Sequence, residues 1–152
     1  MKKFMVVVLM AILSGALAQG RLFGEIASGN MSLVPGFSLD VRARMGAENV
    51  LGPLALRGGF GLLTGGGTQF GIGADVMYFL RSSGNLDFYF GGGLGLVAGG
   101  GTLFSITGNA GLEITVTRDF NFFVELQPAL RFSGGASDFV LGIEFGPRLY
   151  FR

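Results

Sequence analysis

The sequence predicts an all-β fold, an eight-stranded antiparallel up-and-down transmembrane β-barrel preceded by a cleavable signal peptide. Three observations predict it. From Arg21 onward, apolar residues alternate with small, polar or charged ones in eight short runs. Glycine-bearing turns separate most of these runs, and none of the runs has the i, i+3, i+4 apolar spacing of a helix. Within each run, charged residues lie on the face opposite the apolar residues.

The first eighteen residues have the three parts of a secretory signal peptide. Lys2 and Lys3 form a basic region, residues 4–13 are continuously apolar, and Ala16-Leu17-Ala18 is a small-residue cleavage site. The apolar stretch is shorter than the ~20 residues that a membrane-spanning helix needs. We therefore expect cleavage between Ala18 and Gln19, which divides the chain into a signal peptide at 1–18 and one barrel domain at 19–152.

Charge and composition narrow the partners that the chain can have. Both lysines fall within the signal, so nine arginines face ten acidic residues after cleavage and the formal charge becomes −1. This balance argues against a nucleic-acid partner. The chain contains no cysteine, which excludes disulfides and thiolate metal sites.

The alternation places the strands, in chain order, at about 21–29, 36–45, 53–63, 68–80, 86–97, 103–116, 120–132 and 138–151. The run at 36–45 separates its faces clearly, with Phe37, Leu39, Val41, Ala43 and Met45 opposite Ser38, Asp40, Arg42 and Arg44. The last run does so too, with Phe139, Leu141, Ile143, Phe145, Pro147, Leu149 and Phe151 opposite Gly142, Glu144, Gly146 and Arg148. An even number of strands lets both termini of the chain lie on the same side of the membrane.

The composition of the two faces predicts which one points outward. A water-soluble barrel buries its apolar face, whereas a membrane barrel turns that face to lipid. Here the apolar faces are large and the polar faces are rich in glycine, which fits lipid outside and small or charged residues inside a narrow lumen. The alternative is a soluble lipocalin-like or sandwich protein that carries an apolar ligand. The signal peptide and the absence of lysine from the strands argue against that alternative.

Aromatic residues should mark the two edges of the membrane. If the N-terminus is periplasmic, the outward aromatics near the external rim are Phe37, Phe70, Phe104, Phe132 and Phe139. Those near the periplasmic rim are Tyr78, Phe88, Phe120, Phe122 and Phe151. The distance from Phe70 to Tyr78 along a strand is about 26 Å at ~3.3 Å per residue, which matches a band of ~25 Å.

The polar faces supply six acids and five arginines to the interior, and we predict that they form a charge network. Its members are Glu25, Asp40, Arg42, Arg44, Arg57, Asp75, Glu113, Glu125, Arg131, Glu144 and Arg148. Opposite charges in so narrow a space should pair, since an unpaired buried charge costs several kcal/mol. We therefore expect a plugged interior. The alternative is a narrow channel for water, ions or small solutes. We expect Glu48, Arg81, Arg118 and Asp119 to be solvated in periplasmic turns.

After signal cleavage the chain resembles the small eight-stranded outer-membrane barrels of the OmpA/OmpX type, and Leu149-Tyr150-Phe151 is similar to their C-terminal aromatic strand. Arg152 after Phe151 and short external connections depart from that pattern. The resemblance implies a monomer in the bacterial outer membrane, contact with outer-membrane lipid and with the outer-membrane assembly machinery, and a structural role in envelope integrity.

No enzymatic site is predicted. Outer-membrane barrels that are lipases, acyltransferases, deacylases or proteases use a histidine as general base, and this chain has no histidine. The glycine runs at 65–67, 91–95 and 99–101 lack the strand–loop–helix context and the following lysine of a phosphate-binding loop. We therefore expect no catalytic residues, cofactor or metal.

Overall fold

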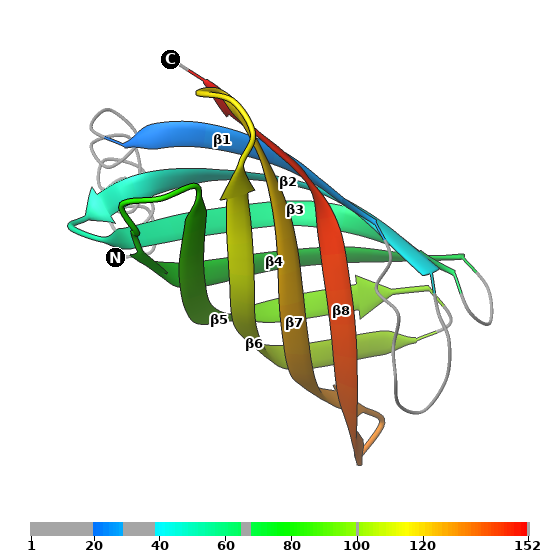
Figure 1. Ribbon diagram of the computed structural model, residues 1–152. Helices are drawn as coiled ribbons and strands as arrows, with labels where there is room; N and C mark the ends of the chain where they lie inside the picture. Colours follow the sequence, from blue (N-terminus) through cyan, green and yellow to red (C-terminus); the bar gives the residue numbers. More distant parts are fainter. Residues whose placement is uncertain (1–19, 29–38, 65–67, 100, 152) are drawn as a thin grey trace, which may run out of the picture.

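The computed structural model describes residues 20–28, 39–64, 68–99 and 101–151. They form a closed barrel in the order β1-β2-β3-β4-β5-β6-β7-β8, in which each strand pairs antiparallel with its chain neighbours and β1 pairs with β8 (Figure 1). The bounds are β1 Arg21–Ser28, β2 Leu39–Leu51, β3 Leu54–Thr64, β4 Thr68–Leu80, β5 Leu86–Ala98, β6 Thr102–Thr115, β7 Phe120–Ser133 and β8 Ala136–Phe151. The predicted eight-stranded antiparallel barrel is confirmed. The expected signal peptide, its cleavage site at Ala18 and Gln19, and Phe37 lie outside the described residues.

The two ends of the barrel differ, and we name them here. The termini end is where β1 begins and β8 ends, and it also carries the turns at 52–53, 81–85 and 116–119. The far end is the opposite one, where β7 turns into β8 at Gly134 and Gly135. In the part of the chain that the structure describes, no helix is long and apolar enough to cross a membrane.

One predicted strand is substantially wrong. β2 extends to Leu51 rather than ending at residue 45. The pairing of β2 with β3 shifts register between Ala47 and Leu51, and Asn49 has a φ of 58° there. The alternation itself continues to Glu48, which pairs with Arg21 on β1, so the predicted end at residue 45 came before the pattern broke.

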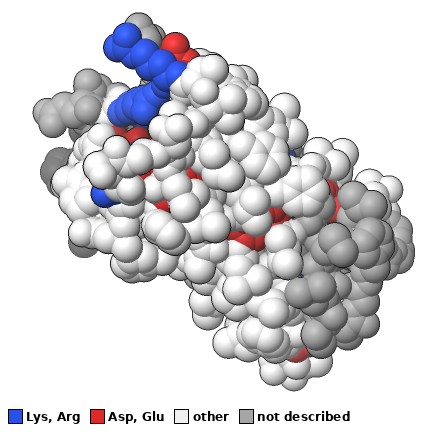
Figure 2. All heavy atoms as spheres, viewed as in Figure 1, with Lys and Arg blue, Asp and Glu red and all other residues white. Residues whose placement is uncertain are grey.

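The apolar face of every strand points outward. Ile26, Met45 and Leu94 are more than half exposed, and large apolar side chains are exposed on all eight strands. Figure 2 shows the result: residues other than Arg, Asp and Glu cover most of the described surface in view, arginine atoms gather at one end, and a few acidic atoms are visible between the white ones. The barrel thus has the reverse of the polarity of a soluble protein.

The interior also contains a cluster of apolar side chains that the sequence analysis did not predict. Its buried members are Phe23, Ala55, Met77, Phe79, Tyr89 and Tyr150. The expectation that only small or charged residues fill the lumen is therefore wrong. Glycines on adjacent strands make room for the largest rings, because a Cβ at Gly46 would lie 2.3 Å from the Phe23 ring and one at Gly111 would lie 2.3 Å from the Tyr89 ring.

Candidate functional site: the charged interior

The candidate site is the set of charged side chains inside the barrel. Alternation along each strand turns all eleven predicted residues toward the interior. Eight of them are buried, with at most 6% of the residue exposed: Glu25, Asp40, Arg44, Arg57, Glu113, Glu125, Glu144 and Arg148. Arg42, Asp75 and Arg131 keep more contact with solvent. Together they come from seven strands, all except β5.

Arg57 and Arg148 lie at the centre of the network. Arg57 Nη1 is 2.9 Å from Glu125 Oε2 and 3.3 Å from Glu25 Oε2, while its Nε is 3.1 Å from Asp75 Oδ2. The Nε of Arg148 donates to Glu25 Oε1 at 2.7 Å, and its Nη1 contacts Glu113. Glu25 therefore bridges the two arginines, and both guanidinium groups are fully buried.

A second pair of arginines extends the network toward the far end. Arg44 lies 3.0 Å from Glu25 and 2.8 Å from Glu144. Arg42 lies 2.8 Å from the other oxygen of Glu144 and 3.4 Å from Asp40. Four of the five predicted arginines thus have carboxylate partners in the interior, and the shared acids link them into one continuous network.

Aromatic rings surround the most buried cation. The guanidinium carbon of Arg148 lies 4.8 Å from the ring centroid of Phe23, 5.1 Å from that of Tyr89 and 5.3 Å from that of Phe123. At these distances the ring faces attract a cation, an effect of about 2 kcal/mol or more when water is excluded. The rings also remove the water that would otherwise separate the charges, so the ion pairs and the apolar cluster depend on each other.

A further polar group lies at the termini end and was missed in the sequence. The hydroxyl of Tyr150 is 2.5 Å from Glu48 Oε1 and 2.6 Å from Glu113 Oε1. Arg81 bridges Glu48 at 2.5 Å and Asp87 at 2.6 Å. The expectation that Glu48 is solvated is wrong, since only 3% of the residue is exposed. Glu48 keeps the two-residue period of Asp40, Arg42 and Arg44 and pairs with Arg21 on β1, so it was missed because the predicted strand ended at residue 45.

The electrostatics of Arg81 follow from these contacts. Burial disfavours its charged form, but the Glu48 carboxylate and the hydrogen bond to Asp87 outweigh burial and raise the pKa of Arg81 above its ordinary value. Arg81 therefore stays protonated at every pH that the fold meets. By contrast, Arg118 and Asp119 are exposed in the 116–119 turn, where the sequence analysis places them.

Other interior residues could have been found from the sequence. Tyr89 and Phe123 follow the inward alternation of β5 and β7, and the Tyr89 hydroxyl donates to Glu125 at 2.9 Å. Asn121 and Gln127 share the inward face of β7, where they contact Glu113 and Arg42. The signal was the strand period itself, which assigns a face to aromatic and amide residues as well as to charged ones.

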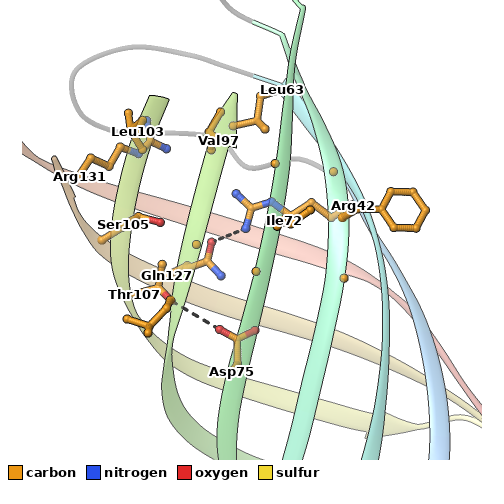
Figure 3. Close-up of a pocket in the computed structure, with 18 of the residues that line it drawn as sticks. Arg42, Leu63, Ile72, Asp75, Val97, Leu103, Ser105, Thr107, Gln127 and Arg131 are labelled. Carbon is orange, nitrogen blue, oxygen red and sulfur yellow. Dashed lines mark hydrogen bonds between the residues drawn. The ribbon is translucent and has the colours of Figure 1, made fainter. Parts of the chain in front are cut away.

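Arg131 stands apart from the network. It forms no ion pair with a carboxylate among the described residues, and it lines a cavity in the far half of the barrel together with Arg42, Asp75 and Gln127 (Figure 3). In this view Arg42 donates to Gln127 at 2.9 Å, and the Thr107 hydroxyl donates to Asp75 at 3.5 Å. The cavity volume is about 770 Å³, including the space at its open side.

The outward aromatics lie near both ends of the barrel. Toward the far end, Phe70, Phe104, Phe132 and Phe139 are exposed on the outer face, and Phe104 packs against Phe132 with ring centroids 6.1 Å apart. Toward the termini end the outward set is Tyr78, Phe88, Phe120, Phe122 and Phe151. Within the described ranges, no three Asp, Glu, His or Cys side chains form a cluster that could hold a metal ion.

Comparison with known proteins shows the fold. No protein-family model matches the chain, and no curated protein matches it either. Among solved structures, it is similar to Neisserial surface protein A (16% identity, TM-score 0.62, covering 86% of this chain and 96% of that one). It is also similar to a de novo designed transmembrane β-barrel, with 16% identity and a TM-score of 0.68 over 87% of this chain and 96% of that one. A third match is the N-terminal β-barrel domain of Pseudomonas aeruginosa OprF, with 14% identity and a TM-score of 0.59 over 86% of this chain and 98% of that one. The chain thus has the fold of small eight-stranded outer-membrane barrels.

Proposed function

We propose that this chain is a small, monomeric outer-membrane barrel whose interior is plugged, and that it has a structural role in envelope integrity. It is neither an enzyme nor an open pore. In this proposal a signal peptide directs export, and the outer-membrane assembly machinery inserts the barrel into lipid. The outward apolar surface supports contact with lipid, because only a hydrocarbon environment suits so many exposed Leu, Ile, Val and Phe side chains.

The observation that carries the plugged interior is the complete burial of its central charges. The side chains of Arg57, Arg148, Glu113 and Glu125 have no exposed surface. They lie between the aromatic rings around Arg148 and the Arg42–Glu144 contact, and this burial supports a plug at this level of the barrel axis. An eight-stranded barrel is also narrow enough for side chains to fill it.

Planar-bilayer recording tests the plug directly. We expect the purified barrel to insert without resolved unitary conductance, because the paired charges would have to separate before an ion could pass. The rival function is a narrow conduit for water, ions or small solutes, and the cavity in the far half favours it. A stable conductance that changes with Arg42→Glu or Glu113→Lys would establish the conduit instead.

Fractionation tests the membrane location. We expect the protein in the outer-membrane fraction, with faster electrophoretic migration before heating than after it, because the closed barrel resists detergent at room temperature. A soluble carrier of apolar ligands would instead be recovered from the periplasm without detergent. Recovery there with unchanged migration on heating would exclude the membrane barrel.

A further inference from the structure

We propose that the cavity in the far half of the barrel binds a small organic anion with a short apolar body, and that Arg131 holds its acidic group. This site is separate from the plug, since the plug closes one side of the cavity and the described residues leave its far side open. A barrel that does not conduct can therefore still bind a ligand from the side where β7 turns into β8.

Glycines create the space for the ligand. The inward positions of β3, β4 and β5 beside the cavity are largely without side chains: Gly59, Gly61, Gly71, Gly73 and Gly95. Arg42 and Arg44 lie over Gly61 and Gly59, since a Cβ at either glycine would come within 2.7 Å of the arginine Cγ. The space between these strands is open on one side, and its total of about 770 Å³ includes that open part.

The charges in the cavity favour an anion at its outer part. Arg42 and Arg44 are neutralised by Glu144 at 2.8 Å each. Arg131 has no such partner among the described residues. Asp138 lies directly opposite it in the β7–β8 pairing, but that residue is exposed and no ion pair joins the two. Arg131 can therefore offer its bidentate guanidinium to a carboxylate or phosphate without first losing a buried contact.

The apolar side chains nearby indicate the rest of the ligand. Figure 3 shows Leu63, Val97 and Leu103 at the same end of the cavity as Arg131, whereas Asp75 lies toward the opposite end. Asp75 is held by Arg57 at 3.1 Å, and its negative charge would repel an anion placed deep in the cavity. The acidic group therefore stays beside Arg131, and the apolar body packs against the aliphatic side chains.

Methyl NMR can test this with hexanoate as the probe. The barrel is placed in nanodiscs of zwitterionic lipid, with Leu and Val methyl groups labelled, and hexanoate is titrated in. We expect saturable shifts of Leu63, Val97 and Leu103, while the outward Leu96 and Leu126, which do not line the cavity, do not move. The neutral analogue hexanamide should bind at least about tenfold more weakly, because it lacks the charge that Arg131 recognises.

Two variants and one control locate the binding. Arg131→Gln should weaken hexanoate binding at least about tenfold, whereas Arg118→Gln, which removes an exposed arginine at the termini end, should leave it unchanged. Ala129→Phe fills the cavity while keeping Arg131 and should abolish the shifts, so the proposal stays testable if Arg131→Gln does not fold. Equal affinity for hexanamide, or shifts confined to outward methyls, would overturn it.

A second arm separates the two possible sources of the anion. The same methyls are followed in nanodiscs containing phosphatidylglycerol, without hexanoate. If they shift there, the anionic group comes from a lipid of the membrane. If they shift only with hexanoate, the ligand is a free solute. Absence of shifts in both arms would show that the cavity has no anion site.

Discussion

Arg148 shows how a single residue can depend on the whole barrel. Its guanidinium contacts Glu25 on β1 and Glu113 on β6, and rings from β1, β5 and β7 surround it. Burying a cation is favourable here only because the two carboxylates and the rings replace its water. Arg148 therefore stabilises the barrel through its ion pairs and ring contacts and not as an isolated charge.

Replacing Arg148 by Met should reduce the free energy of unfolding by about 3–5 kcal/mol, because it leaves Glu25 and Glu113 buried beside an apolar side chain. Unfolding in urea, followed by far-UV circular dichroism in detergent, measures the loss. Arg118→Met is the matched control on an exposed arginine and should change stability by about 0.5 kcal/mol at most. Adding Glu113→Gln to Arg148→Met should recover part of the loss. If Arg148→Met is as stable as the parent, the network does not stabilise the fold.

The direction of each interior side chain was predictable, but its partner was not. Alternation places Glu25 and Arg148 inside, yet they are 123 positions apart and meet only through the closure of β1 with β8. The distance along the chain gives no hint of the pairing. Glu48 is a different case: it continues the alternation of Asp40, Arg42 and Arg44, and its inward direction was missed because the predicted strand stopped at residue 45.

At the scale of the strands, the seam between β1 and β8 is what makes the sheet a barrel. Its register places Leu22 opposite Phe151 and Glu25 opposite Arg148. A shift of one residue would place Glu25 and Arg148 on opposite faces of the sheet and break their contact. The interior charges thus specify the register of the closing pair.

Engineered cysteines can measure this register, because the chain has no cysteine of its own. Leu22→Cys with Phe151→Cys should form a disulfide in the folded barrel, since directly opposed residues lie within bridging distance. Leu22→Cys with Pro147→Cys places the second thiol about 13 Å farther along β8 and should stay reduced. Mobility on non-reducing gels distinguishes them. Crosslinking of the second pair but not the first would disprove the register.

The strand positions themselves were largely readable from the sequence. β4 was predicted at residues 68–80 and is observed at Thr68–Leu80. Its alternation is unbroken and turns flank it, so pattern and structure coincide. β2 differs because the prediction ended it at residue 45, although its alternation continues to Glu48 and its register with β3 shifts only after Ala47.

For the whole molecule, the main consequence of the fold is that apolar residues face outward. Single-tryptophan variants test this, because the chain contains no tryptophan. In vesicles of brominated lipid, Phe90→Trp should lose most of its fluorescence, since Phe90 is 52% exposed on the outer face. Phe123→Trp should keep most of its fluorescence, because Phe123 is fully buried in the interior. Vesicles of unbrominated lipid are the control. Equal quenching of both variants would contradict the assigned faces.

The distribution of the charges among hairpins bears on the order in which the barrel can assemble. Arg44 and Glu25, 3.0 Å apart, belong to the hairpin of β1 and β2, and Arg57 and Asp75, 3.1 Å apart, belong to that of β3 and β4. Each of these two hairpins can therefore enter a membrane with an arginine and a carboxylate already paired within it. Glu113 lies 3.9 Å from Arg81 but meets its buried partner Arg148 only on the last strand, so the final step of insertion both closes the sheet and completes the pairing of that carboxylate.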